Sequence, residues 1–134
     1  MKKTFLFITL LVFVLMLISC AMNEAKLKES GAKLLSQQDL IEFFKVERIG
    51  TGKNKQGKSG KIHYFPDGTQ KLKYSGGGDE GKYRVENGQF CSKWKEIRGG
   101  SEQCYRIYRT GENKIMFVNL DGSVDGGSAM TFKK

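Results

Sequence analysis

Short runs of alternating polar and apolar residues, separated by turn sequences, limit the possible fold more than any other feature of this chain. The runs cover residues 46–51, 61–65, 70–75, 82–86, 89–95, 102–109 and 114–120. Alternation with period two is typical of strands that bury one face. Asn-Gly and Asp-Gly pairs stand at residues 87–88 and 121–122, and they favour tight hairpin turns because both central residues need positive φ.

Seven strands joined by short connections predict an antiparallel meander. Exposed strand edges promote aggregation, so a meander of this length is expected to close on itself. The predicted fold is mainly β, with about seven to eight strands forming a small barrel or a folded sheet, and with one short N-terminal helix. Most of the 17 glycines fall between the runs, which assigns them to turns rather than to cofactor loops.

The short helix is expected over about residues 37–45, in the sequence LLSQQDLIEFFK. Ser36 is a good N-cap, and Asp39 has the spacing of its capping-box partner. Leu35 and Leu40 have the spacing of a hydrophobic staple. The apolar face of this helix either packs on the domain or lies on a membrane surface.

The N-terminus, MKKTFLFITLLVFVLMLISCAMNE, has the order of features found in a secretory signal. Two lysines precede an apolar segment that is shorter than the ~20 residues of a membrane span. The sequence LISC resembles the bacterial lipoprotein processing box. That resemblance implies cleavage before Cys20 and attachment of a diacylglyceryl group to its thiol. An ordinary cleaved signal, or an uncleaved anchor, is the alternative.

The expected organisation is therefore a lipoprotein signal peptide over 1–19, a lipid-anchored tether over 20–35 and a single β-rich domain over 36–134. Ala21 follows the cysteine, where an aspartate typically marks retention in the inner membrane. By the same resemblance, the protein is expected in the cell envelope, on the periplasmic face of the outer membrane.

The chain has 23 basic and 14 acidic residues, a net charge of +9. Removal of Lys2 and Lys3 with the signal leaves 21 basic residues against 14, a net charge of +7. A basic envelope protein meets anionic lipid, acidic glycan or another envelope protein, although a basic surface also simply promotes solubility. The compartment argues against a nucleic-acid partner.

Cys91 and Cys104 remain as an even pair in an oxidising compartment, which favours a disulfide. A hairpin centred between residues 97 and 98 places these two cysteines opposite each other, and it places Lys93 opposite Glu102. The C-x-x-C spacing of redox-active pairs is absent, so the predicted bridge is structural.

Residues 52–59, GKNKQGKS, spell a phosphate-binding P-loop. A P-loop must lead into a helix, whereas the following KIHYF alternates like a strand. The segment is instead predicted to be a basic hairpin loop, in which Lys53, Lys55 and Lys58 contact an anionic surface. No cofactor is predicted.

Other polar groupings do not form a convincing site. DGSVDG at 121–126 begins like a calcium loop, but residue 132, where such a loop needs glutamate, is phenylalanine. His63 is the only histidine, and Asp79 and Glu80 are neighbours in a glycine-rich segment, so neither provides a catalytic or metal-binding set. The aromatic residues near the predicted hairpin either form the core or line a binding groove. They are Tyr83, Phe90, Trp94, Tyr105 and Tyr108.

Residues 81–124, with C-x-x-W followed by C-Y, resemble a bacterial family catalogued as domain of unknown function 995. YFPDGT and LSQQDLIEFF are also similar, so the likeness covers about residues 36–124. Tyr83 stands where tryptophan is commoner. The resemblance implies this fold and the disulfide, but no reaction.

The predicted function is that of a non-enzymatic envelope lipoprotein, a binding or accessory module for an anionic surface. The alternative is an inhibitor of lysozyme-type muramidases, because SGGGDEGKY at 75–83 has the composition of an inhibitory loop. An enzyme would need acids or a nucleophile converging from separate strands.

Overall fold

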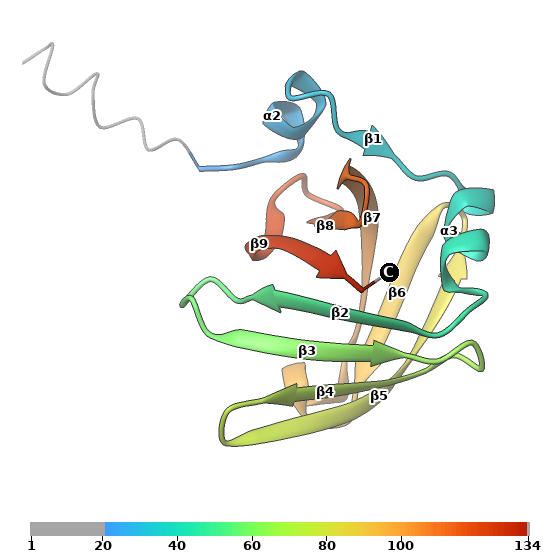
Figure 1. The fold of residues 1–134 in the computed structure, drawn as a ribbon, viewed down its shortest axis with the longest axis vertical. Helices are drawn as coiled ribbons and strands as arrows, with labels where there is room; N and C mark the ends of the chain where they lie inside the picture. The colour runs from blue at the N-terminus through green and yellow to red at the C-terminus, as the bar shows by residue number, and fades with distance from the viewer. Residues whose placement is uncertain (1–20, 134) are drawn as a thin grey trace, which may run out of the picture.

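Eight antiparallel strands follow one another around a closed barrel in the computed structural model, which describes residues 21–133 (Figure 1). They are β2 (Arg48–Lys53), β3 (Ser59–Tyr64), β4 (Thr69–Tyr74), β5 (Gly77–Glu86), β6 (Gln89–Trp94), β7 (Glu102–Gly111), β8 (Lys114–Asn119) and β9 (Val124–Phe132). β9 pairs with β2 and closes the ring. The predicted mainly β fold is confirmed, in its barrel form. The predicted signal peptide over 1–19 and Cys20 lie outside the described residues.

Two strands differ from the predicted runs, because some glycines lie within strands and not in turns. β9 was not among the seven runs, and β5 begins at Gly77 rather than at residue 82. A Cβ on Gly78 would lie 2.5 Å from the Leu72 carbonyl oxygen, and one on Gly81 would lie 2.3 Å from that of Lys93. These glycines therefore permit close approach of paired strands. The sequence pattern does not distinguish a glycine with this role from a glycine in a turn.

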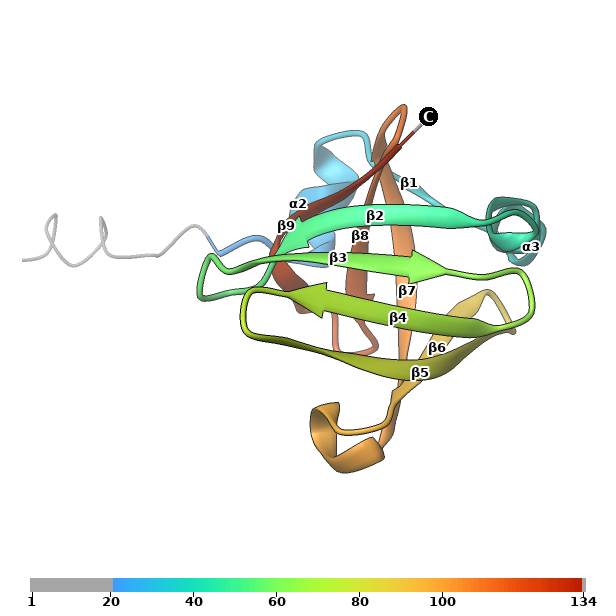
Figure 2. The ribbon, with the colours of Figure 1, turned by 60° about the horizontal axis from the view of Figure 1, so that its bottom comes forward.

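Helix α3 (Gln37–Phe44) closes one end of the barrel, as Figure 2 shows. The predicted capping box is present: Asp39 N donates to Ser36 Oγ over 3.1 Å, and Ser36 N donates to Asp39 Oδ2 over 2.9 Å. The ring of Phe44 enters the barrel and lies 4.9 Å from that of Phe90 and 5.3 Å from that of Tyr64. The main core gathers around this helix and includes Leu35, Leu40, Phe44, Tyr64, Phe90, Tyr105, Ile107, Ile115 and Phe132.

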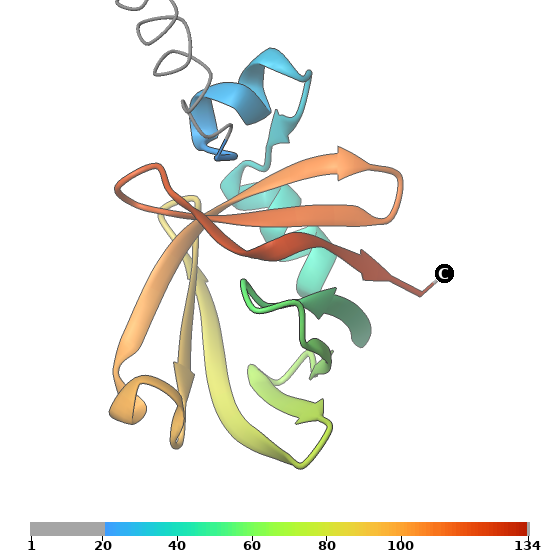
Figure 3. The same ribbon diagram turned by 90° about the vertical axis from the view of Figure 1, so that its left-hand side faces the viewer.

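The two ends of the barrel differ in their covering. Because the strands alternate in direction, α3 shares its end with the connections β3–β4, β5–β6 and β7–β8. We call this the helix end. The connections β2–β3, β4–β5, β6–β7 and β8–β9 lie at the other end, which we call the open end. Figure 3 looks onto that side. The β6–β7 connection contains the short 3₁₀ helix η1 (Ile97–Gly100).

The segment expected to be a polar tether is folded against the outside of the barrel. It forms helix α2 (Glu24–Glu29) and the short strand β1 (Lys33–Leu34), which pairs with β7. Leu27 is buried against Tyr108, Val118 and Val124 in a second apolar cluster. Those three residues lie on the outer face of the sheet, and α2 covers them there. Within residues 21–133, no helix is long and apolar enough to cross a membrane.

Candidate ligand cavity at the open end

The open half of the barrel contains a cavity of about 1040 Å³. Small-molecule sites typically occupy ~300–1,000 Å³, so the space suits a ligand rather than a few waters. It lies at the end opposite α3, where several inward positions carry small residues, among them Gly52, Gly60 and Ser92. The apolar wall is formed by Ile62, Leu72, Phe90, Trp94, Phe117 and Met130, with Tyr64, Tyr74 and Tyr105 between them.

The basic loop predicted from GKNKQGKS forms part of the rim of this cavity. It is the β2–β3 hairpin, and Lys53, Lys55 and Lys58 all contribute to the lining. Asn54 orders the turn, since its Oδ1 accepts hydrogen bonds from the backbone N–H groups of Gln56 and of Lys58 over 3.0 and 2.9 Å. A strand follows the motif, as expected for a hairpin and not for a P-loop.

A polar cluster lies inside the rim, where η1, β7 and β9 meet. The Arg98 guanidinium is 3.8 Å from the carboxylate of Asp125 and 5.6 Å from the ring centre of Tyr105. Burial raises the pKa of Tyr105, and the negative charge of Asp125 adds to that rise, so its hydroxyl stays protonated at neutral pH. The cluster offers donors and one acceptor to a ligand in an otherwise apolar wall.

Asp79 holds η1 in position and thereby fixes Arg98. Its Oδ2 accepts hydrogen bonds from the N–H groups of Glu96 and Ile97, over 3.1 and 2.9 Å. Burial raises the pKa of Asp79, but these backbone donors outweigh that effect and hold the pKa below its usual value. Glu80 points to the outer face, where it lies 3.9 Å from Lys71. The two carboxylates therefore face opposite sides of β5 and do not form a pair.

A buried amide forms a second polar point beside the cavity. Gln70 is 1 % exposed, and its Nε2 donates to Ser92 Oγ over 2.7 Å and to the Lys82 carbonyl oxygen over 3.2 Å. Its Oε1 has no hydrogen-bond partner among the described residues. Because Ser92 lines the cavity, this pair gives the wall a hydroxyl group held by a buried side chain. Gln70 was not among the predicted site residues. Its only signal in the sequence is that a polar residue stands at an inward position of a predicted strand.

The predicted disulfide joins β6 and β7 on the outside of the barrel. Cys91 is bonded to Cys104, and the predicted register is confirmed by the pairs Cys91↔Cys104 and Lys93↔Glu102. The carboxylate of Glu102, however, lies 2.8 Å from the Arg84 guanidinium. The two cysteines and Glu102 form the one cluster of metal-ligand types among the described residues, but both sulfurs are used in the bond.

Of the aromatic residues near the β6–β7 hairpin, some line the cavity and others are packed elsewhere, so each of the two expectations holds for part of the set. Phe90, Trp94 and Tyr105 line the cavity, whereas Tyr83 packs against the main core. Tyr108 lies on the outer face, beneath α2. The hairpin cluster is thus partly core and partly binding wall.

The remaining polar motifs lie outside the cavity or in turns. His63 is on the outer face, where its Nε2 contacts the Glu47 carboxylate and its ring stacks on Phe65 at 4.1 Å. Asp121 accepts hydrogen bonds from Ser123 N and Oγ over 2.9 and 2.6 Å, and these bonds lower the pKa of its carboxyl group. DGSVDG is therefore a turn with its first carboxylate already used. Residues 75–83 form the β4–β5 turn and the first part of β5, paired with β4.

No protein-family model, curated protein or solved structure matches this chain. The resemblance to domain of unknown function 995 stays a prediction.

Proposed function

We propose that this protein is a non-enzymatic binding protein of the cell envelope, which holds a small amphipathic, anionic ligand inside its barrel. The observation that supports this function is the position of the cavity. An apolar wall leads outward to a rim that carries Lys53, Lys55 and Lys58. This order of surfaces matches a molecule with an apolar body and a negatively charged head.

The two surfaces contribute differently to binding. Each methylene group that leaves water for the apolar wall contributes ~0.8 kcal/mol, so the ligand body supplies most of the affinity. The rim lysines are solvated, and ion pairs in such positions add little energy each. They attract anions and repel cations, so they speed the association of anionic ligands and make binding selective for them.

The envelope location is part of the same proposal. The basic N-terminus, the apolar segment and the LISC sequence support processing and acylation at Cys20. The bridge between Cys91 and Cys104 is consistent with an oxidising compartment. In that compartment, amphiphiles released from membranes are available as ligands, whereas a nucleotide is not.

The chain has an intrinsic probe for the test, since its single tryptophan, Trp94, lies in the cavity wall. Dodecyl phosphate and dodecyl maltoside, which share an alkyl chain, are titrated below their micelle concentrations while Trp94 fluorescence is recorded. We expect a saturable change with both and tighter binding of the phosphate. If neither compound alters the emission, the cavity is not a ligand site. Equal affinity for both would remove the anionic part of the proposal.

A matched pair of variants locates the binding. Leu72→Phe puts a larger side chain into the cavity, whereas Leu34→Phe makes the same change on an exposed residue of β1. We expect the first variant to weaken dodecyl phosphate binding at least tenfold and the second to leave it unchanged. Far-ultraviolet circular dichroism of both variants checks that the barrel is retained.

A further inference from the structure

We propose that the open end of the barrel docks on an anionic lipid bilayer, so that the cavity faces the headgroups and exchanges its ligand directly with the membrane. This inference deepens the proposed function and rests on it only for the identity of the ligand as a membrane amphiphile. The docking itself depends on the N-terminal contacts and on the charge of the rim.

The first described residues are attached to the β8–β9 turn, at the open end. Glu24 N donates to the Gly122 carbonyl oxygen over 2.9 Å, and Asn23 forms an antiparallel bridge with Ser123. In Figures 1 and 2, the start of the described chain and the β2–β3 turn lie on the same side of the molecule. The chain thus enters the domain beside the cavity and not at the helix end.

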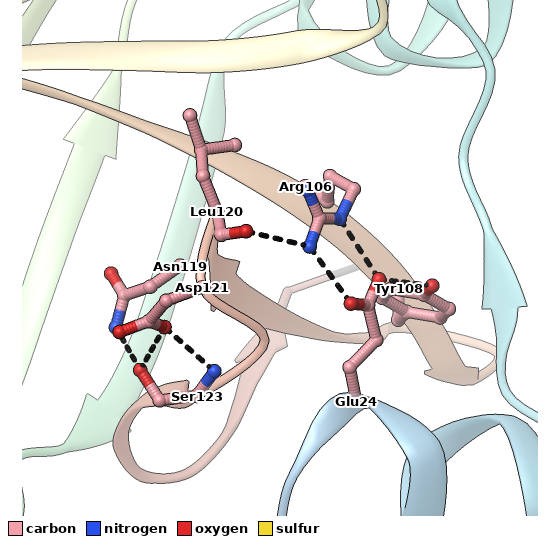
Figure 4. A network of polar contacts seen from close by, with 7 residues as sticks. All are labelled: Glu24, Arg106, Tyr108, Asn119, Leu120, Asp121 and Ser123. Carbon is pink, nitrogen blue, oxygen red and sulfur yellow. Dashed lines mark hydrogen bonds and ion pairs between the residues drawn. The ribbon is translucent and has the colours of Figure 1, made fainter.

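The side chain of Glu24 reinforces this attachment (Figure 4). Arg106 Nε and Nη2 donate to its two carboxylate oxygens, each over 2.8 Å, and the Tyr108 hydroxyl donates to Oε1 over 2.6 Å. Both partners belong to β7, so α2 is bonded to the barrel wall as well as to the turn. We call these three residues the Glu24 network.

Covalent geometry then limits the distance to an anchor. Cys20 precedes Asn23 by three residues, which span at most about 10 Å when fully extended. If Cys20 is acylated, its position at the membrane surface keeps the β8–β9 turn within about that distance of the headgroups. An anchor so close to a fixed point restricts the orientation of the barrel, and the open end is the end brought to the membrane.

The charge of the rim suits that orientation. Lys53, Lys55 and Lys58 form no salt bridge with another described residue, so their charges are available to a surface. A lysine near an anionic leaflet tightens association about fivefold, and three together about a hundredfold.

A second basic surface competes with this assignment and provides the control. Lys61 faces Lys73 and Lys82 faces Lys93 across neighbouring strands, on the outside of β3 to β6. This outer face lies along the barrel wall, away from the N-terminal attachment. A protein that binds membranes through general basicity would use it as readily as the rim.

The first experiment measures binding of residues 21–134 to vesicles by flotation. This fragment contains both apolar clusters and the disulfide, so it includes every described stabilising contact. The vesicles contain equal parts of phosphatidylglycerol and phosphatidylcholine, with pure phosphatidylcholine for comparison.

One variant has the three rim lysines, Lys53, Lys55 and Lys58, changed to Gln. Its control has Lys61, Lys73 and Lys82 of the outer face changed to Gln. We expect binding to the anionic vesicles only, lost about a hundredfold in the rim variant and largely kept in the control. The inference is overturned if the control loses as much as the rim variant, or if the unmodified fragment does not bind.

The second experiment measures orientation on the full acylated chain in the same vesicles. A polarity-sensitive dye is placed at Lys55→Cys on the rim, or at Thr110→Cys, an exposed position of β7 at the helix end. We expect lipid-borne quenchers to reduce the emission of the dye at 55 and to leave the dye at 110 unaffected. Equal quenching at both positions, or stronger quenching at 110, contradicts the docking.

The two proposals fail separately. Dodecyl phosphate binding to Trp94 is measured in solution and needs no membrane, whereas flotation and quenching need no ligand in the cavity. Loss of vesicle binding with intact dodecyl phosphate binding would leave a soluble carrier. The opposite result would leave a membrane-docked domain whose cavity has another use.

Discussion

Replacement of Glu24 by Gln tests the attachment of α2 most directly. Gln has nearly the same size but no charge, so the variant keeps the packing of the helix and removes the ion pair with Arg106. The Arg106 and Tyr108 donors lower the pKa of Glu24 from its ordinary value of 4.5 to about 2. That difference of about 2.5 in pKa corresponds to about 3 kcal/mol in favour of the ionised, folded state. The Glu24 side chain is only 16 % exposed, so screening by solvent reduces this value modestly.

We therefore expect Glu24→Gln to lose about 2 to 3 kcal/mol of the free energy of unfolding at pH 7, measured with urea. The sign of the pH dependence follows from the lowered pKa. An acid whose pKa is lower in the folded state contributes its full stabilisation at pH values above its pKa in the unfolded chain. It loses this stabilisation as the pH falls through its pKa in the folded protein. The difference between the two proteins should be constant above pH 5 and should shrink between pH 4.5 and pH 2. Somewhat less than half of the full difference should remain at pH 3.

Leu27→Ala is the matched control, because it loosens the same helix without removing a charge. Leu27 is 2 % exposed in the outer cluster, and such a truncation costs about 2 to 4 kcal/mol at every pH. Parallel pH profiles for Glu24→Gln and Leu27→Ala would refute the reasoning, as would a loss below about 0.5 kcal/mol for Glu24→Gln at pH 7. Either result would mean that the carboxylate is solvated and that α2 is held by packing alone.

Four further variants test the barrel. Gly81→Ala should cost more than about 3 kcal/mol or prevent folding, because its Cβ would meet backbone atoms, whereas Gly88→Ala, with open space but a φ of +71°, should cost about 1 kcal/mol in the same urea titration. Ser36→Ala removes the acceptor of the capping box and should lower the free energy of unfolding by about 1 kcal/mol. Changing Cys91 and Cys104 together to Ala opens a bridge with a sequence separation of 13 and should cost about 3 kcal/mol, and chemical reduction of the native protein should have the same effect on its melting curve.

Local rules predicted much of the barrel wall. The register of the hairpin joining β6 and β7 was predicted correctly, because its turn centre, its charges and its cysteines all indicate the same pairing. Helix α3 was predicted equally well, since a capping box and a hydrophobic staple mark one N-terminus. In both cases, the determining interactions lie within about a dozen residues, so the sequence alone contains them.

Non-local contacts explain what was missed. Gly127 lies in β9, where a Cβ would come 2.2 Å from the carbonyl oxygen of Asn54, so its role depends on the β2–β3 turn, over 70 residues away. Glu24 was assigned to a tether because its partners, Arg106 and Tyr108, are about 80 residues distant. The aromatic part of the cavity wall was left open as one of two readings, but the small part was not predicted, because inward residues such as Gly60 look like turn signals in the sequence.

The same alternating sequence pattern leads to different packing at the two ends of the barrel. At the helix end, inward residues meet the ring of Phe44 and are buried in a close-packed core. At the open end, the inward residues of β2 and β3 are Gly52 and Gly60, which face each other and fill almost nothing. Larger apolar side chains at those two positions would bury more surface and raise stability. The open end has glycine at these positions, beside rim lysines that form no salt bridge with another described residue, and the N-terminal attachment lies at the same end. A structural role alone does not explain that coincidence, whereas the proposed ligand exchange at a membrane explains it.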